Sequence, residues 1–183
     1  MKELYKENLW NKIHEEINSL KNDESMKGFF KKNVLDFDNL TDSITYIISN
    51  KLINDDMSES NIIVNIREAF LDDGILIAIE EDINEVFKKD PACNYLFQPL
   101  LFYKGFHSIT AYRVANYWLN EKPSFSMYIQ SIVSEKFNVD IHPNAKIGKG
   151  IMVDHASGVV IGETAKIGDY SSLFHGVTLG GVG

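Results

Sequence analysis

The stretch that decides the fold runs from residue 141 to residue 179 and reads IHPNAKIGKGIMVDHASGVVIGETAKIGDYSSLFHGVTL. Divided into sixes, with Val159 and Val160 left over as two extra residues, it begins every six with an aliphatic side chain. These positions are Ile141, Ile147, Val153, Ile161, Ile167, Leu173 and Leu179. A strand has period two and an α-helix a period of about 3.6, so neither explains the pattern. The pattern indicates an internal repeat.

A six-residue repeat predicts a parallel β-helix in which three short faces make one coil. The aliphatic residue of each six points into a narrow core, and glycine or another small residue occupies the corners. The two extra residues make residues 20 apart stack across the first two coils, about 4.8 Å from each other. We therefore expect three stacked pairs: His155 with His175, Asp154 with Phe174, and His142 with Gly162.

The preceding part of the chain has a helical rhythm. In the first segment, Leu4, Leu9, Ile13 and Ile17 recur at four or five residues. Further helices are expected over residues 40–52, 58–73, 74–90, 100–120 and 126–137. The expected capping residues are Thr41 or Asp42 for the first of these and Ser58 or Ser60 for the second. The predicted fold class is α+β, with an all-helical domain at 1–138 and a β-helix domain at 139–183. The latter holds two coils and the start of a third.

Composition excludes several classes of function. The net charge of −8 disfavours a nucleic-acid partner, because such binding depends largely on neutralised phosphates. No stretch approaches the roughly 18 apolar residues of a membrane span, and the amino terminus lacks the apolar run of a signal peptide. The single cysteine, Cys93, excludes an internal disulfide and favours a reducing, cytoplasmic location. Cys93 itself is expected to be a small buried residue.

The histidines suggest acid–base chemistry rather than a metal site. Zinc needs converging imidazoles, and His142 falls on a different face from His155 and His175. A histidine can take a proton from a hydroxyl, and a carboxylate on its other nitrogen stabilises the imidazolium. Asp154 should point away from its neighbour on an extended face, so Asp140 is the better partner. Spacing alone does not establish that contact, and a solvated His155 on an outer face remains an alternative.

Two longer segments of the sequence resemble a known protein family. The segments DPACNYLFQPLLFYKGFHSITAYRVANYWL (90–119) and VDIHPNAKIGKGIMVDHASGVVIGETAKIGDYSSLFHGVTLGG (139–181) resemble the bacterial long form of serine O-acetyltransferase, a hexapeptide-repeat acyltransferase. The resemblance implies a left-handed β-helix. It also implies transfer of the acetyl group of acetyl-CoA to the hydroxyl of L-serine, which gives O-acetylserine for cysteine biosynthesis. Acetyl-CoA is then a co-substrate, with no metal and no covalently bound cofactor.

The resemblance also assigns roles to residues. It implies that His155 is the general base and that Asp140 completes its dyad. Asp154 and Asp90 would contact serine or, in its place, cysteine. Gly180 and Gly181 would lie at the acetyl-CoA site. His175 is expected, from its place above His155 in the register, to line the same pocket as His155.

The implied partners are L-serine, acetyl-CoA, L-cysteine as feedback inhibitor, and further copies of the chain in a trimer or a dimer of trimers. O-acetylserine sulfhydrylase would bind only if the parent protein has the family's carboxy-terminal tail. The sequence ends within VTLGGVG, where family members continue, so we expect a truncated chain with weak or no activity. The alternatives are a hexapeptide acetyltransferase for another hydroxyl acceptor, and a non-catalytic oligomerisation or regulatory fragment.

Overall fold

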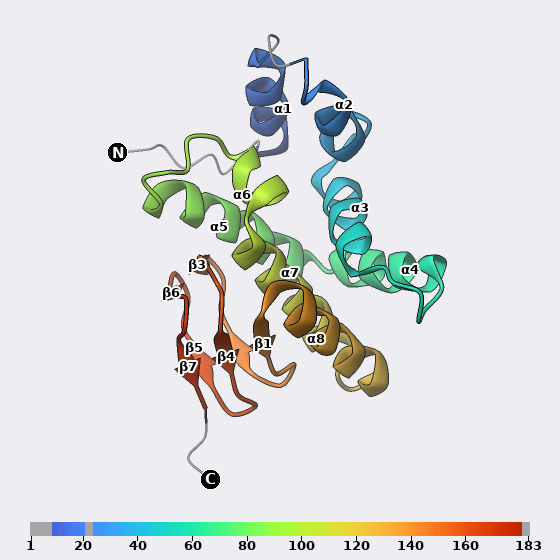
Figure 1. Cartoon of the computed structure of the whole chain (residues 1–183), viewed down its shortest axis with the longest axis vertical. Coiled ribbons are helices and arrows are strands. Elements are labelled where there is room, and N and C mark those ends of the chain that lie inside the picture. The colour runs from blue at the N-terminus through green and yellow to red at the C-terminus, as the bar shows by residue number, and fades with distance from the viewer. Residues whose placement is uncertain (1–8, 21–23, 181–183) are drawn as a thin grey trace.

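The computed structural model describes residues 9–20 and 24–180. Helices fill the chain as far as residue 137, and strands follow from residue 139 (Figure 1). Helix α1 (Leu9–Ser19) buries Leu9, Ile13 and Ile17, which confirms the apolar stripe of the first segment. Leu4 lies outside the described residues. No helix among the residues described combines the length and the apolar character that a bilayer crossing requires.

The other helices are α2 (Lys27–Phe30), a π-helical turn η1 (Lys31–Leu35), α3 (Leu40–Leu52), α4 (Glu59–Phe70), α5 (Asp73–Lys89), α6 (Phe97–Phe102), α7 (Lys104–Trp118) and α8 (Pro123–Phe137). The prediction for 40–52 is confirmed, and those for α4, α5 and α8 are right within three residues. The single helix predicted over 100–120 is wrong, because Tyr103 is extended (φ −91°, ψ 109°) and separates α6 from α7. The helical segment at 27–35 was not predicted.

The helix caps differ in part from expectation. Asn39, not Thr41 or Asp42, caps α3, and its side chain accepts the backbone N–H of Asp42 at 2.8 Å. Ser58 does precede α4, but its side chain makes no capping hydrogen bond there. A run of several polar residues before a helix offers more than one candidate, and the sequence does not say which adopts the extended backbone of a cap.

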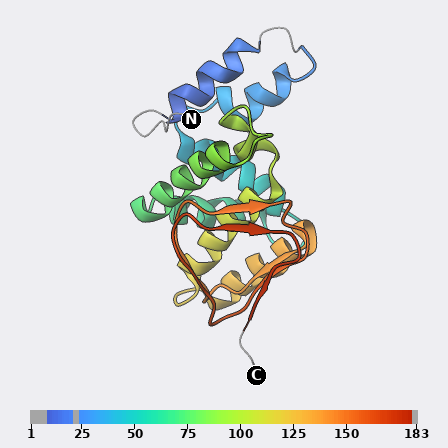
Figure 2. The ribbon, with the colours of Figure 1, turned by 90° about the vertical axis from the view of Figure 1, so that its left-hand side faces the viewer.

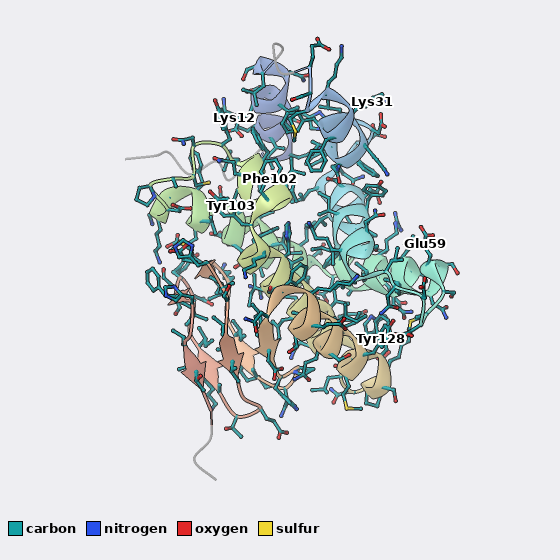
Figure 3. The ribbon with its side chains drawn as sticks, viewed as in Figure 1. Lys12, Lys31, Glu59, Phe102, Tyr103 and Tyr128 are labelled. Atoms are coloured by element: carbon teal, nitrogen blue, oxygen red, sulfur yellow. The ribbon has the colours of Figure 1, made fainter. Side chains whose placement is uncertain are left out.

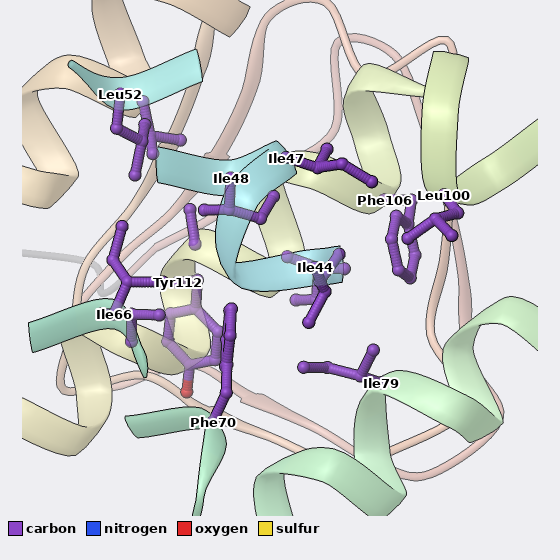
Figure 4. Close-up of a cluster of buried hydrophobic side chains, with 14 of the residues drawn as sticks. Ile44, Ile47, Ile48, Leu52, Ile66, Phe70, Ile79, Leu100, Phe106 and Tyr112 are labelled. Atoms are coloured by element: carbon purple, nitrogen blue, oxygen red, sulfur yellow. The ribbon is translucent and has the colours of Figure 1, made fainter. Parts of the chain in front are cut away.

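The helices enclose a core that reaches from α3 to α7. Ile44 and Ile48 of α3 meet Ile66 and Phe70 of α4 and Phe106 of α7, all fully or almost fully buried (Figure 4). Removing such side chains from water contributes about 25 cal/mol for each Å² of apolar surface. The aromatic residues of α7 therefore belong largely to the core.

The strands form three parallel sheets as the chain coils on itself (Figure 2). They are β1 (Val139–Ile141), β2 (Lys146–Ile147), β3 (Met152–Asp154), β4 (Val159–Ile161), β5 (Lys166–Ile167), β6 (Ser172–Phe174) and β7 (Thr178–Leu179). The sheets have the orders β1-β4-β7, β2-β5 and β3-β6. Each face of one coil thus pairs with the same face of the next.

The pairing confirms the predicted register. Ile141 pairs with Ile161, Ile147 with Ile167, Val153 with Leu173, and Asp154 with Phe174, all 20 residues apart. Between the second and third coils the offset is 18, with Val160 opposite Thr178.

The two extra residues lie elsewhere than we expected. Val159 and Val160 are ordinary members of β4, paired with Val139 and Asp140. Five residues separate Asp154 from Val160, whereas three separate their partners Phe174 and Thr178. The insertion is therefore in the turn between β3 and β4, at residues 155–158, and Val159–Val160 is wrong as its location. A repeat pattern in the sequence shows how many residues are inserted, but it does not show which turn contains them.

The first coil has a strand partner on one side only, and α7 covers the other. Its N–H groups at Lys146 and Met152 bond to the second coil, while three of its carbonyls accept hydrogen bonds from side chains of α7, the helix that runs beside the coils in Figure 1. Polar side chains of α7 donate to those carbonyls. The bonds run from Tyr112 Oη to Ala145 O (2.6 Å), from Asn116 Nδ2 to Pro143 O (2.7 Å) and from Arg113 Nη2 to Gly148 O (2.9 Å). The helix thereby protects the open end of the coils.

A buried ion pair reinforces this junction. Asp82 of α5 is fully buried, and its Oδ2 accepts from Arg113 Nε at 3.1 Å and Nη2 at 2.7 Å. Its Oδ1 accepts the N–H of Ile151 at 2.7 Å. Burial raises the pKa of Asp82 to about 6, and the Arg113 guanidinium and the Ile151 N–H offset part of that rise. The pair connects α5, α7 and the segment leading into β3.

We expect Asp82→Ala to lower the free energy of unfolding by about 3–5 kcal/mol, because it leaves the Arg113 charge buried without its partner. Urea denaturation measures the loss. Glu68→Ala is the control, since Glu68 is exposed, 3.8 Å from Lys122, and such pairs contribute at most about 1 kcal/mol. Equal losses in the two variants would contradict a structural role for the buried pair.

A second prediction concerns His107 of α7, which is buried with Nε2 2.9 Å from Leu100 O. Burial, with a contribution from Lys51, lowers its pKa to about 3 from 6.5. Below pH 6.5 the unfolded chain therefore binds a proton at His107, whereas the folded chain binds it only near pH 3. The contribution of His107 to the free energy of unfolding is fully present above pH 6.5. It decreases as the pH falls, and about 2 kcal/mol is lost at pH 5.

Unfolding of the wild type and of His107→Gln, compared at pH 8 and pH 5, isolates this effect. The raised pKa of Asp82 acts in the opposite direction and is common to both proteins, so it cancels in the difference. The variant should lose about 2 kcal/mol less than the wild type on acidification. Parallel pH profiles would show that His107 is not the group responsible.

Candidate active site

A cavity of about 660 Å³ lies where the helices meet the first coil. The end of α5 and the following turn supply Asp90, the start of α7 supplies Lys104, and β3 with its turn supplies Asp154 and His155. Apolar side chains, among them Val86 and Met152, line the remainder. Asp90 and the consecutive residues Asp154 and His155, which the sequence singled out, thus line one cavity, although Asp90 and Asp154 are 64 residues apart along the chain.

His155 stands at the entrance to the inserted turn with a left-handed backbone. Its φ is 56° and that of Ala156 is 60°, and the N–H groups of Ala156 and Ser157 bond back to the carbonyls of Asp154 (2.6 Å) and His155 (2.7 Å). We expected the Asp154 and His155 side chains to diverge on an extended face. The left-handed residue overturns that premise and leaves His155 Nε2 3.6 Å from Asp154 Oδ2.

His155 and His175 lie together as the register predicts. Their ring centroids are 5.7 Å apart, with an angle of 60° between the ring planes. The His155 side chain is 72% exposed, so a substrate can reach its nitrogens. A neutral imidazole in this position can accept a proton from a hydroxyl.

The helical wall of the cavity holds Asp90 in a defined position. Asp90 ends α5, and its Oδ1 accepts the N–H of Ala92 at 2.8 Å. Tyr103 lines the same cavity, where burial, followed by the nearby Cys93 and Asp90, raises the pKa of its hydroxyl. Nearby, Lys104 Nζ donates to Ser157 Oγ at 2.5 Å, which joins the start of α7 to the inserted turn.

Asp140 takes a different place. Its half-buried side chain accepts from Gln130 Nε2 of α8 at 2.7 Å, and it does not line the cavity. In the part of the chain that the structure describes, no three His, Cys, Asp or Glu side chains gather closely enough to hold a metal ion. His142 is bonded locally, with Nδ1 accepting the N–H of Asn144 at 3.1 Å.

Comparisons with known proteins agree with this arrangement. The family model described as "Serine acetyltransferase, N-terminal" matches residues 9–111. The serine acetyltransferase of Buchnera aphidicola from Acyrthosiphon pisum is 44% identical over 178 residues, which cover 96% of this chain and 65% of that protein. The chain belongs to the serine acetyltransferase family.

Solved serine acetyltransferase structures share the fold. A serine acetyltransferase in complex with CoA superposes with a TM-score of 0.91 at 40% identity, over 94% of this chain and 75% of that one. Another, in complex with cysteine, gives 0.92 at 40% identity, over 96% and 74%. The present chain thus spans about two thirds of the length of its curated relative and about three quarters of these two solved chains.

Sequence reasoning missed part of the lining of the cavity. Tyr103 and Lys104 line it because the chain breaks between α6 and α7, and the continuous helical rhythm of 100–120 conceals that break. The LFYKGFH segment, quoted for its resemblance, was the available signal. Gly180 follows β7, with open space where a Cβ would lie, and Gly181 lies outside the described residues.

Gly105 sets the approach of α7 to β3. A Cβ built on it would come within 1.9 Å of the Val153 carbonyl oxygen, a backbone atom that cannot move aside alone. We expect Gly105→Ala to destabilise the protein by about 1–3 kcal/mol and to separate the two walls of the cavity. Gly28→Ala, where no atom lies within 4 Å, should change stability by no more than about 1 kcal/mol. Thermal unfolding of both variants measures the contrast, and an unaffected Gly105→Ala would refute the close contact.

Proposed function

We propose that the gene product acetylates L-serine, with acetyl-CoA as donor, to form O-acetylserine for cysteine biosynthesis. The observation that carries the proposal is the cavity that joins Asp90 of the helical part to Asp154 and His155 of the coils, in a chain 44% identical to a serine acetyltransferase. We further propose that residues 1–138 and 139–183 are two domains and that the second is a left-handed β-helix. A cytoplasmic location fits a chain whose one cysteine is a buried free thiol.

His155 is the general base of the proposed reaction. It takes the proton of the serine hydroxyl as that oxygen attacks the thioester carbonyl of acetyl-CoA. The tetrahedral oxyanion is stabilised by a hydrogen-bond donor such as a backbone N–H. Its collapse expels the thiolate of CoA, to which His155 returns the proton. One histidine therefore serves both halves of the transfer, and no metal is required.

Three carboxylates have two roles in this proposal. Asp154 and Asp90 both line the cavity and complement the ammonium group of the amino acid. Asp140 is the proposed dyad partner of His155. It lies in β1, and the residue before β1 is beside the end of the inserted turn, since Gly158 N–H bonds to Asn138 O at 2.8 Å. In the structure Asp140 is held by Gln130, so the dyad requires Asp140 to accept from the imidazole as well.

Ligands and assembly follow the relatives. A family structure holds CoA and another holds cysteine, so we propose that CoA binds beside Gly180 and Gly181 and that L-cysteine inhibits from the serine site. His175 does not line the cavity of the described residues, but its ring centroid is 5.7 Å from that of His155, and we propose that it borders the same pocket when ligands are bound. The protein is proposed to form a trimer or a dimer of trimers. Docking to O-acetylserine sulfhydrylase is proposed only for a gene product that carries the family's carboxy-terminal tail.

The test is acetyl transfer to L-serine, followed by release of the CoA thiol, in the full gene product. His155→Gln should lower kcat at least about 100-fold, because base catalysis of this kind contributes about 10²–10⁴-fold. Calorimetric titration with L-cysteine should give binding in both proteins. His142→Gln, on a different face, should keep normal kcat.

Near-normal turnover by His155→Gln would refute its role as base. A wild type that acetylates another hydroxyl compound in preference to serine would support the acceptor alternative. A wild type that neither acetylates serine nor binds cysteine would leave the fold with an assembly or regulatory function.

A further inference from the structure

Lys89 is the last residue of α5 and directly precedes Asp90 of the cavity. Its Nζ donates to the carbonyl oxygen of Tyr170 at 2.7 Å and to Ser172 Oγ at 3.1 Å, residues of the second coil that are 81 and 83 positions further along the chain. The end of α5 lies over the edge of the coils that carries β3 and β6, and side chains occupy the space between them (Figure 3). Lys89 therefore joins the end of α5 to the second coil.

A buried carboxylate directs the Lys89 side chain toward the coils. Glu85 lies one turn earlier in α5 and is almost fully buried, and its Oε1 is 2.7 Å from Lys89 Nζ. A lysine ammonium has three donors, and three oxygen atoms, from Glu85, Tyr170 and Ser172, lie within 3.1 Å of it. A lysine held by three acceptors has lost the conformational freedom of a solvated side chain. The contact is therefore a fixed link between the helix and the coil.

This link reaches the strand that carries Asp154. Ser172 of β6 pairs with Met152 of β3, and Asp154 follows Met152 by two residues in the same strand. The ladder thus attaches β3 to β6, and Lys89 attaches the end of α5 to β6. Because Asp90 and Asp154 line the cavity from α5 and β3, the link contributes to the separation of the two carboxylates.

We propose that Lys89 is a positioning residue of the amino-acid site, which fixes the place of Asp90 relative to Asp154 so that both carboxylates reach the ammonium of L-serine or L-cysteine. This proposal rests on the proposed serine acetyltransferase function. Lys89 is not among the residues that line the cavity, so it acts through Asp90 and not by contact with the substrate. It acts on binding of the amino acid and not on the chemical step or on binding of acetyl-CoA.

The direction of the effect distinguishes position from charge. Lys89 carries a positive charge next to Asp90, so by charge alone its removal would favour binding of a substrate ammonium. Loss of position acts in the opposite direction, because a displaced carboxylate makes a longer and weaker hydrogen bond to that ammonium. Weaker binding of the amino acid after removal of the Lys89 ammonium would therefore report on position.

Lys89→Met tests the proposal because it removes the ammonium and keeps an unbranched apolar stem. In the full gene product, KM for L-serine and Kd for L-cysteine should each rise about 10-fold, as expected when a hydrogen bond to a charged group is lost. The kcat and the KM for acetyl-CoA should stay within about twofold.

Lys88→Met is the matched control. Lys88 is the neighbouring residue with the same charge, and its Nζ lies 3.7 Å from the same Glu85 carboxylate, but its side chain is 48% exposed and forms no hydrogen bond with the described part of the coils. The same substitution there should leave all these constants within about twofold.

A double-mutant cycle shows whether Lys89 acts through Asp90. In an Asp90→Asn background, the residue that Lys89 positions has no charge for the substrate ammonium. Adding Lys89→Met should then raise KM for serine by less than about twofold. An undiminished 10-fold effect in that background would overturn the proposal.

Ser172→Ala decides the matter if Lys89→Met does not fold. It removes one acceptor of the Lys89 ammonium on the second coil and changes no charge. KM for serine should rise about fourfold, with kcat and KM for acetyl-CoA within about twofold. Ser171→Ala is its control, since the Ser171 hydroxyl donates to Gly168 O within its own turn at 2.8 Å, and KM should not change.

The other outcomes are equally distinct. A Lys89→Met enzyme with an unchanged or lowered KM for serine, or with an equal rise in KM for acetyl-CoA, would overturn the role of Lys89 while the proposed function stands. A wild type that neither acetylates serine nor binds cysteine would overturn the proposed function, and this inference with it.

Discussion

The fold depends on one constraint: the first coil has no strand on its outer side, yet its backbone groups there must be paired. Side chains of the helical part meet that need, with Tyr112, Asn116 and Arg113 donating to carbonyls and Asp82 accepting an N–H. A stack of coils cannot begin in water without losing such bonds or exposing its core. The helices are therefore the surface on which the first coil can form.

The same contact builds the candidate site. Because α7 lies against the first coil, its start at Tyr103 and Lys104 comes beside β3 and the turn that holds His155. Gly105 permits the approach, since any larger residue would meet the Val153 carbonyl. The end of α5 comes to the same place, since Asp82 of α5 forms an ion pair with Arg113 of α7. Structural support and the bringing together of Asp90, Asp154 and His155 are thus two results of one packing arrangement.

The coils with their six-residue repeat and the helices with their apolar periodicity could be predicted from the sequence. A period of six gave the pairing of Asp154 with Phe174 and of His155 with His175, because register follows directly from counting. It could not give the location of the two-residue insertion or the break at Tyr103, which depend on backbone angles and on packing against distant residues. The proposed Asp140–His155 dyad came from resemblance and stays a prediction.

The turn between β3 and β4 departs from the regular spacing of the coils by two residues. Without its two extra residues, the first coil would match the 18-residue spacing of the next, and the scaffold would be more regular. His155 and Ala156, within this longer turn, both have a left-handed backbone. Drift of the sequence toward a perfect repeat would make the scaffold more regular, and it would shorten the very turn that carries the proposed general base.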